Sequence, residues 1–124
     1  MIASSNEIVE ATRTLIVEDS YLLGLQMKMD LESLGMVIHG PVPNVRLAMD
    51  LIEKETVDAA ILDINLGNET SFPIAQALMK RNIPFIFITG YDDLILNDND
   101  FRNHTLFRKP IRIQTLYDAV RKFD

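Results

Sequence analysis

Charged side chains follow three short apolar runs of the sequence. Glu18 and Asp19 come directly after one run, Asp63 ends a second, and Lys109 follows a third. Carboxylates gathered at the ends of buried segments are energetically costly, and clusters of this kind typically hold a metal ion or perform chemistry. The pattern predicts that Asp63 is a nucleophile that accepts a phosphoryl group.

The counter-charge for these acids is expected to be a divalent cation, because three neighbouring carboxylates do not all stay ionised without one. Mg2+ suits phosphate chemistry, since it takes oxygen ligands and keeps several waters, and Mn2+ is the alternative ion. We expect Asp19 and Asp63 to bind the ion, Glu18 to act through a water, and the backbone carbonyl of Asn65 to complete the protein's ligands. Attack of Asp63 on phosphorus then forms an aspartyl phosphate.

Two further side chains are expected to stabilise the transferred group. Thr89 follows the fourth apolar run and can donate a hydrogen bond to one phosphoryl oxygen. Lys109 can neutralise another oxygen, because phosphoryl transfer depends on positioning and charge stabilisation. The bond between Lys109 and Pro110 is a candidate cis peptide, which determines where the ammonium group points.

The elements that position these residues alternate regularly along the chain. Short runs rich in branched apolar residues are typical of strands buried on both faces, and longer amphipathic stretches separate them. We expect a flavodoxin-like α/β domain, that is, a doubly wound sheet of five parallel strands in the order 2-1-3-4-5 with helices on both faces. Strands one and three are then neighbours, and ligands bind beyond their carboxyl ends. The expected strands are residues 14–17, 36–39, 59–62, 85–88 and 105–107.

Helical periodicity and end signals mark the intervening helices. Ser20, Asn44 and Ser71 are expected to be N-caps, whereas Gly35 and Asn82 follow the ends of helices. Residues 92–103 fit the scheme least well, and we expect a short or mobile helix there. Three stripes are expected to face the core; their members are Val45, Ala48, Met49 and Ile52, then Ile74, Ala75 and Leu78, and finally Ile113, Leu116, Tyr117 and Val120.

The first helix carries two apolar stripes. One is assigned to the core, and the other lies roughly 160° around the helix and suggests a docking face for a partner helix. Cover by the N-terminal segment and scattered exposure are the alternatives. The core stripe contains Leu23, Met27, Leu31 and Leu34, and the partner stripe contains Leu22, Leu25 and Met29.

Composition limits the class of protein. The 124 residues suffice for one domain, expected at residues 14–124 after an N-terminal tail at residues 1–13. The absence of cysteine excludes disulfides and thiolate chemistry, and a net charge of -6 argues against binding nucleic acid or anionic membranes. With neither a membrane-spanning run nor a secretory signal, we expect a cytoplasmic monomer or weak dimer. The chain ends at Asp124 after the fifth helix, so no output domain is expected.

The combined motif resembles the response-regulator receiver domains of bacterial two-component signalling. The resemblance rests on Glu18 with Asp19, on Asp63, on Thr89, and on Lys109 with Pro110. It implies that Asp63 takes a phosphoryl group from a phosphohistidine of a sensor kinase or phosphotransfer protein. It also implies Mg2+-dependent self-phosphorylation and loss of the group to an in-line water, rather than enzymatic turnover of a substrate.

A narrower resemblance is to the FAT GUY subfamily of receivers. The segment Phe87-Ile88-Thr89-Gly90-Tyr91 is similar to its signature, and residues 63–67 and 69–73 are similar to its next loop. The subfamily implies a stand-alone receiver that works with HWE or HisKA_2 histidine kinases in alphaproteobacteria, several members acting in general stress signalling.

One position departs from ordinary receivers. They carry an aromatic residue three positions before the lysine, where this chain has Leu106, and the FAT GUY subfamily shares the absence. Phe107 is not expected to substitute, because adjacent strand residues point to opposite faces. We therefore expect Thr89, Gly90 and Tyr91 to form the switch.

Three other functions are alternatives to that of a phosphoacceptor. A phosphatase that works through an aspartyl phosphate needs a second acid two residues after the nucleophile, where Asn65 stands. A nucleotide binder needs a glycine-rich loop after the first strand, where residues 18–21 are acidic and lack glycine. A scaffold that keeps the receiver fold without accepting phosphate stays open as the alternative.

Overall fold

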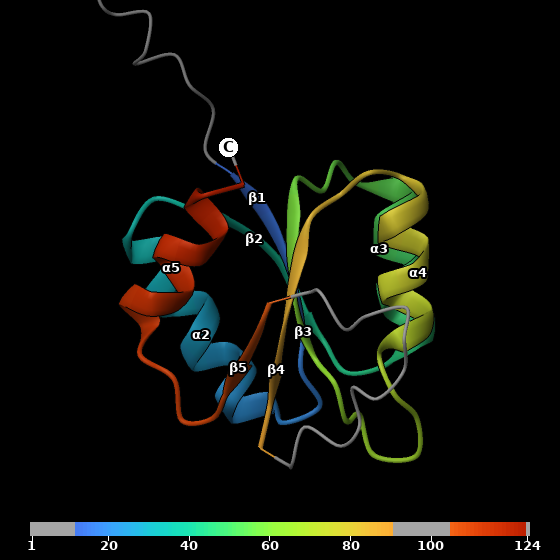
Figure 1. Ribbon diagram of the computed structural model, residues 1–124, viewed down its shortest axis with the longest axis horizontal. Coiled ribbons are helices and arrows are strands. Elements are labelled where there is room, and N and C mark those ends of the chain that lie inside the picture. Colours follow the sequence, from blue (N-terminus) through green and yellow to red (C-terminus); the bar gives the residue numbers. More distant parts are fainter. Residues whose placement is uncertain (1–11, 91–104, 124) are drawn as a thin grey trace, which may run out of the picture.

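Five parallel strands form one sheet in the structure, a computed structural model that describes residues 12–90 and 105–123. The strands are β1 (Arg13–Val17), β2 (Val37–Val42), β3 (Ala59–Asp63), β4 (Phe85–Thr89) and β5 (Leu106–Arg108). The helices are α2 (Tyr21–Ser33), α3 (Val45–Lys54), α4 (Phe72–Lys80) and α5 (Ile113–Arg121). The strand order β2-β1-β3-β4-β5 confirms the predicted flavodoxin-like topology (Figure 1).

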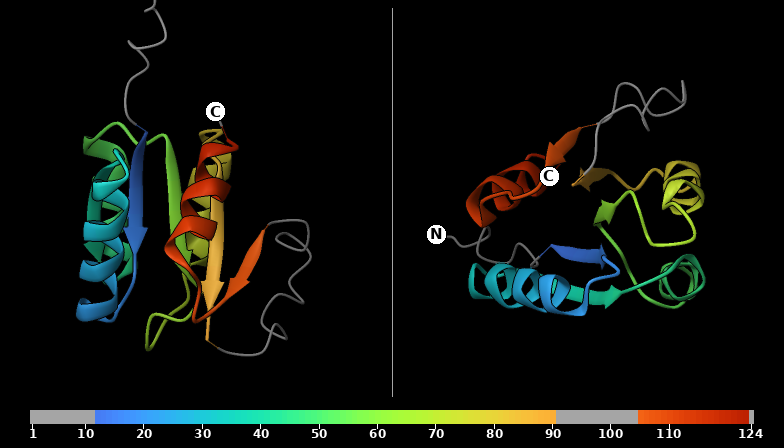
Figure 2. Two further views of the ribbon diagram at one scale, coloured as in Figure 1. Left: turned by 90° about the vertical axis from the view of Figure 1, so that its left-hand side faces the viewer. Right: turned by 90° about the horizontal axis from the view of Figure 1, so that it is seen from below.

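The helices cover both faces of the sheet, as predicted. Helices α3 and α4 lie on one face, and α2 and α5 lie on the other (Figures 1 and 2). Alternate strand residues feed two separate cores, so that Leu15 and Leu62 pack toward α3 and α4 while Ile16 and Ile61 pack toward α2 and α5. The apolar stripes expected on α3, α4 and α5 are buried or partly buried in these two cores.

Strand β5 separates Leu106 from its neighbour Phe107 in the expected way. Leu106 packs against the core under α3 and α4, whereas Phe107 packs against the core under α2 and α5. The phenyl ring therefore does not occupy the side of the strand on which Leu106 lies. The strand begins at Leu106, one residue later than expected.

Strand β2 differs more from the expected residues 36–39. It continues to Val42, past a register irregularity between β1 and β2. Only glycine suits position 40 at this irregularity, because its φ is 97 and a Cβ there would lie 2.7 Å from the carbonyl oxygen of Ile16. Gly40 therefore forms a bulge rather than a strand end. Beyond the bulge, Val42 O accepts a hydrogen bond from Glu18 N at 3.0 Å, which fixes the backbone of the first acidic residue.

All three residues predicted as N-caps occupy the N-cap position, and two of them cap the helix with a side-chain hydrogen bond. Ser20 Oγ accepts from Leu23 N at 3.4 Å, and Asn44 Oδ1 accepts from Leu47 N at 2.9 Å. Ser71 occupies the N-cap position of α4, but its buried hydroxyl makes no hydrogen bond within the described residues. Gly35 and Asn82 follow α2 and α4, and both have positive φ, as expected of residues that end helices.

The core stripe predicted for α2 is confirmed only in part. Leu31 is buried and Met27 is partly buried, but Leu23 and Leu34 are 51% and 36% exposed. The helix is apolar on most sides, so its periodicity does not determine which side faces the sheet. The close contact of buried Gly24 with Pro41 accounts for the orientation of the helix. The side of α2 that contains Gly24 and Leu31 therefore faces the sheet.

Replacement of Gly24 with alanine is expected to lower the free energy of unfolding by about 1–2 kcal/mol, although alanine is the better helix former. The new Cβ would lie 2.7 Å from Pro41 Cβ, and a proline ring cannot turn aside. Gly90→Ala is the control, because among the described residues a Cβ there would meet only Lys109 Cδ, at 4.0 Å. Urea unfolding measures both variants, and equal stability of the two would contradict the packing argument.

Several expectations lie outside the described residues. They are the tail up to residue 11, the helix expected at residues 92–103, and Tyr91; β1 begins at Arg13. Among the helices that the structure describes, none has the length and apolar character needed to cross a bilayer.

Candidate phosphoacceptor site

The sheet brings the acids of two distant segments together. Val17 pairs with Leu62, so that Glu18 and Asp19 follow β1 at the same edge at which Asp63 ends β3. One carboxylate oxygen from each acid lies within 4.8 Å of those of the other two. Glu18 and Asp63 are buried, whereas Asp19 is exposed. The cluster predicted from the sequence therefore forms at the carboxyl edge of the sheet.

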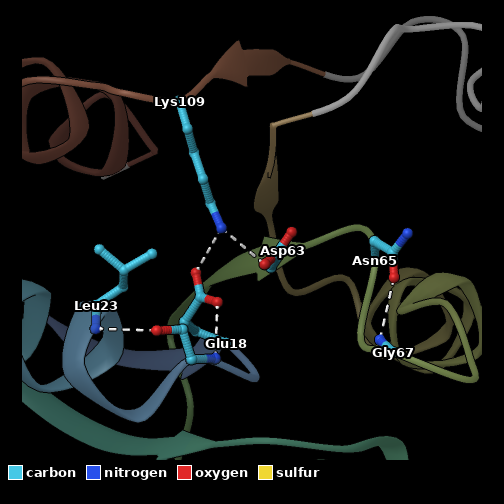
Figure 3. Close-up of polar contacts among 7 residues, drawn as sticks. Glu18, Leu23, Asp63, Asn65, Gly67 and Lys109 are labelled. Atoms are coloured by element: carbon cyan, nitrogen blue, oxygen red, sulfur yellow. Dashed lines mark hydrogen bonds and ion pairs between the residues drawn. The ribbon is translucent and has the colours of Figure 1, made fainter.

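Lys109 reaches this cluster from the segment after β5. Its Nζ lies 2.8 Å from Asp63 Oδ2 and 2.9 Å from Glu18 Oε1 (Figure 3). The backbone of Lys109 is held by a hydrogen bond from its N–H to Thr89 O at 2.8 Å, which ties this segment to the end of β4. The peptide bond between Lys109 and Pro110 is cis, the form expected from the sequence.

Burial and charge act against each other on Lys109. Desolvation favours the neutral amine, but the hydrogen bond and ion pair with Asp63 and the contact with Glu18 outweigh it, so the pKa of Lys109 lies above its usual value. Partial desolvation, and then hydrogen bonding and repulsion by Glu18, raise the pKa of Asp19. Lys109 is thus a firm cation at neutral pH, and the site still has an excess of negative charge.

A contact that the sequence analysis missed fixes the buried acid. Glu18 Oε2 accepts a hydrogen bond from Ser20 N at 3.0 Å, and Ser20 in turn caps α2 (Figure 3). The carboxylate is therefore held by the start of the helix that follows it. Spacing offered a signal, since an acid two residues before a backbone N–H can accept from it in a turn.

Asn65 lies on the loop after β3, where residues 64–71 fold as a tight hairpin. Ser71 N donates to Ile64 O at 3.0 Å and Leu66 N donates to Glu69 O at 2.9 Å, and these bonds flank the pair of Asn65 and Thr70. Residues in such a flanked pair direct their own backbone groups away from each other's strand. The carbonyl of Asn65 is therefore not used within the hairpin. Its side-chain Oδ1 accepts from Gly67 N at 3.0 Å (Figure 3).

The residues present fit a hard divalent cation. All three acids offer oxygen donors, and Lys109 supplies one positive charge beside three carboxyl groups. Buried Glu18 Oε1 contacts Lys109 without the alignment of a hydrogen bond. A cleft of about 600 Å³ opens onto the cluster. Its lining consists of Glu18, Asp19, Ser20, Leu23, Asp63, Asn65, Gly67, Gly90 and Lys109.

The residues predicted to form the switch differ in burial and in whether they line the cleft. Thr89 is buried at the end of β4, one residue beyond Ile88, the partner of Asp63. Gly90 is exposed and lines the cleft. Thr89 is not among the residues that line it, and Tyr91 lies outside the described residues.

Fold and site together define a doubly wound domain with an acidic, lysine-paired site at the carboxyl edge of its sheet. The sequence profile of the response regulator receiver domain matches residues 14–121, and the chain belongs to this family.

Relatives of known sequence support the assignment. The chain is 26% identical over 115 residues to sporulation initiation phosphotransferase F of Bacillus subtilis, covering 90% of this chain and 92% of that protein. It is 27% identical over 113 residues to the sensory transduction protein LytR of Staphylococcus haemolyticus. That match covers 89% of this chain but only 44% of the relative, so the chain spans less than half the length of LytR.

Solved structures share the fold over nearly the whole chain. The receiver domain of the Erythrobacter litoralis response regulator PhyR has a TM-score of 0.81 and 25% identity, covering 92% of this chain and 90% of that one. SdrG from Sphingomonas melonis Fr1 has a TM-score of 0.76 and 40% identity, covering 91% of this chain and 96% of that one. The fold and the family are therefore those of receiver domains.

Proposed function

We propose that this protein accepts a phosphoryl group on Asp63 from a histidine kinase or a histidine phosphotransfer protein and signals through protein contacts or phosphate relay. The observation that carries the proposal is the position of Lys109 Nζ, 2.8 Å from Asp63 Oδ2 and 2.9 Å from Glu18 Oε1, beside the third acid, Asp19. The similar protein SdrG has also been solved in a BeF3-activated conformation, and that structure shares 38% sequence identity with this chain. The direct test is a mass measurement after incubation with Mg2+ and acetyl phosphate.

The residues of the chain supply a nucleophile and a fixed positive charge. A carboxylate oxygen of Asp63 attacks the phosphorus of the donor phosphohistidine, so that an O–P bond forms, the P–N bond breaks, and the imidazole leaves with the electron pair and takes up a proton. Lys109 offsets the added negative charge from a position that it already holds. Attack by a water in line with the new O–P bond releases inorganic phosphate and restores the carboxylate.

Asp19, Asp63, the backbone carbonyl of Asn65 and, through a water, Glu18 would hold Mg2+ or Mn2+ at this site. When bound, such an ion neutralises the acids and the phosphoryl oxygens. Thr89 supplies a hydroxyl at the end of β4 for one phosphoryl oxygen, and Gly90 permits the backbone movement that this contact requires. Thr89, Gly90 and Tyr91 together remain our proposed switch.

The finer assignment is also part of the proposal. We place the chain in the FAT GUY subfamily, acting as a stand-alone cytoplasmic receiver with an HWE or HisKA_2 kinase, in a stress-response pathway. The similarity to the alphaproteobacterial PhyR and SdrG receivers supports it. The packing of Leu106 on the opposite side of β5 from Phe107 supports a switch that uses no aromatic residue at this position.

The exposed side of α2 supports a docking face for the kinase or phosphotransfer helix. Leu22 is 76% exposed and Met29 is 56% exposed, whereas Leu25 is half-buried. Leu23, assigned to the core from the sequence, instead lines an apolar groove between α2 and the segment that starts α5. This groove also includes Glu18 and Lys109, so a helix seated on it would lie next to Asp63. Leu22, Leu25 and Met29 are not among the residues that line the groove.

Leu22→Glu is expected to slow phosphotransfer from the cognate histidine protein by about tenfold, because it places a charge in an apolar contact. Its reaction with acetyl phosphate is expected to be unchanged. Met79→Glu on α4 is the matched control, since Met79 is also an exposed apolar residue but lies on a helix of the opposite face. Radiolabel transfer measures the first reaction and intact mass the second; equal slowing by both donors would refute docking through α2.

A further inference from the structure

The loop that carries Asn65 is tied to a helix far from the site. Glu69 stands in the hairpin of residues 64–71, and its Oε2 accepts a hydrogen bond from Val45 N at 2.9 Å. The two residues are 24 positions apart. Val45 is the first residue of α3, and the loop follows the nucleophile directly. The contact therefore joins the start of α3 to the loop at the acidic site.

The chemistry of this contact makes it stronger than an ordinary surface hydrogen bond. The first N–H groups of a helix have no partner within the helix, and the end of the helix carries partial positive charge. A carboxylate is the acceptor best suited to both conditions. Asn44 Oδ1 already accepts from Leu47 N at the same helix end. The end of α3 thus has two side-chain acceptors, one local and one supplied by the site loop.

Bonds within the hairpin determine its shape, and a hydrogen bond from Ile64 N to Ile88 O at 3.0 Å ties its first residue to β4. The two backbone bonds that flank Asn65 and Thr70 are internal to residues 64–71, as is the bond from Gly67 N to Asn65 Oδ1. Buried Leu66 anchors one side of the hairpin in the core. Among the side-chain hydrogen bonds described for the hairpin, that of Glu69 reaches a separate helix.

We propose that Glu69 is a positioning residue for the divalent cation of the site. By accepting from Val45 N, it holds the hairpin beside the cleft that Asn65 lines, and with it the carbonyl of Asn65, which no bond within the hairpin uses. The inference rests on the proposed function, because it concerns the ion that assists Asp63. The inference predicts that the contact between Glu69 and Val45 affects the metal affinity of the site, although neither residue is a ligand of the ion.

A purely structural role for Glu69 would predict a different outcome. As a cap of α3 alone, Glu69 would contribute to the stability of the helix in the same way as Asn44, and metal affinity would not depend on it. Asn44→Ala is therefore a matched control, since it removes a side-chain acceptor from the same helix end and leaves the hairpin intact. Glu69→Gln keeps an oxygen acceptor without the charge and serves as the conservative variant.

The experiment measures Mn2+ affinity of the full chain by electron paramagnetic resonance, with thermal unfolding recorded for each variant. Glu69→Ala is expected to weaken Mn2+ binding about tenfold, the low end of the effect that follows the loss of a residue that orients a ligand. Glu69→Gln is expected to stay within about twofold of the wild type, and Asn44→Ala to lower the unfolding temperature while keeping wild-type affinity.

Three outcomes overturn the inference, and the last is distinguishable from the first two. Wild-type affinity in a folded Glu69→Ala variant, or equal weakening by Asn44→Ala, shows that Glu69 acts on stability alone. Absence of Mn2+ binding by the wild type refutes the proposed site itself, and this inference with it. Weakening by Glu69→Ala, with affinity kept in both Glu69→Gln and Asn44→Ala, supports the inference.

Discussion

Asp63→Asn is expected to abolish phosphorylation by acetyl phosphate. The wild-type protein, incubated with Mg2+, gains the mass of one phosphoryl group, and the variant gains none. The reason is chemical, because the amide of asparagine is a far weaker nucleophile toward phosphorus than a carboxylate and carries no charge. Loss of one partner of Lys109 leaves the ammonium paired with Glu18, so the site is expected to stay folded. Intact-mass spectrometry reads the result directly.

The control for this experiment is Asp58→Asn. Asp58 immediately precedes β3, at the end of the strand opposite to Asp63, where it contacts Arg13. It belongs to the same segment but lies away from the acidic cleft, so its variant is expected to be labelled as fast as the wild type. Labelling of Asp63→Asn would assign the phosphoryl group to another residue and contradict the proposal. No labelling of the wild type would also contradict it and would favour a scaffold that keeps the fold without accepting phosphate.

Lys109→Met is expected to lower the free energy of unfolding by about 2–3 kcal/mol when no divalent ion is present. The substitution removes the cation from two carboxylates whose side chains are only 1% and 5% exposed, and breaking a buried ion pair leaves an uncompensated charge. The estimate stands at the low end of the usual cost because the Lys109 side chain is 25% exposed at an open cleft. Saturating Mg2+ is expected to restore most of the loss, since it supplies the missing counter-charge.

Urea unfolding with Mg2+ and with a chelator measures this prediction. Lys122→Met is the control, because Lys122 is an exposed lysine just beyond α5 and is expected to change stability by less than about 0.5 kcal/mol. A Lys109→Met variant as stable as the control in chelator would show that the two buried acids do not depend on the ammonium. If Mg2+ raised the stability of both variants equally, the ion would not be replacing the charge of Lys109, and this part of the prediction would be wrong.

Much of the fold followed from local patterns. Short runs of branched apolar residues predicted the strands, and the order 2-1-3-4-5 follows from right-handed crossovers in the commonest arrangement. Two expectations failed where a glycine changes the local geometry. Gly40 extends β2 through a bulge, and Gly24 turns α2 so that Leu23 faces the groove rather than the core. Hydrophobic periodicity predicts neither effect, because each depends on how closely the glycine approaches another part of the chain, a backbone carbonyl for Gly40 and a proline ring for Gly24.

The candidate site was likewise predictable in part from the sequence. The sequence by itself determined which chemistry is available, since Asp63, Asp19 and Lys109 follow strands whose carboxyl ends must meet in a parallel sheet. Only the tertiary structure decided how those groups are held: Val42 accepts from Glu18 N, and Glu69 accepts from Val45 N. These contacts join residues 24 positions apart, and sequence spacing constrains only near neighbours. Side-chain identity is local, whereas the distance between two side chains depends on the packing of the whole sheet.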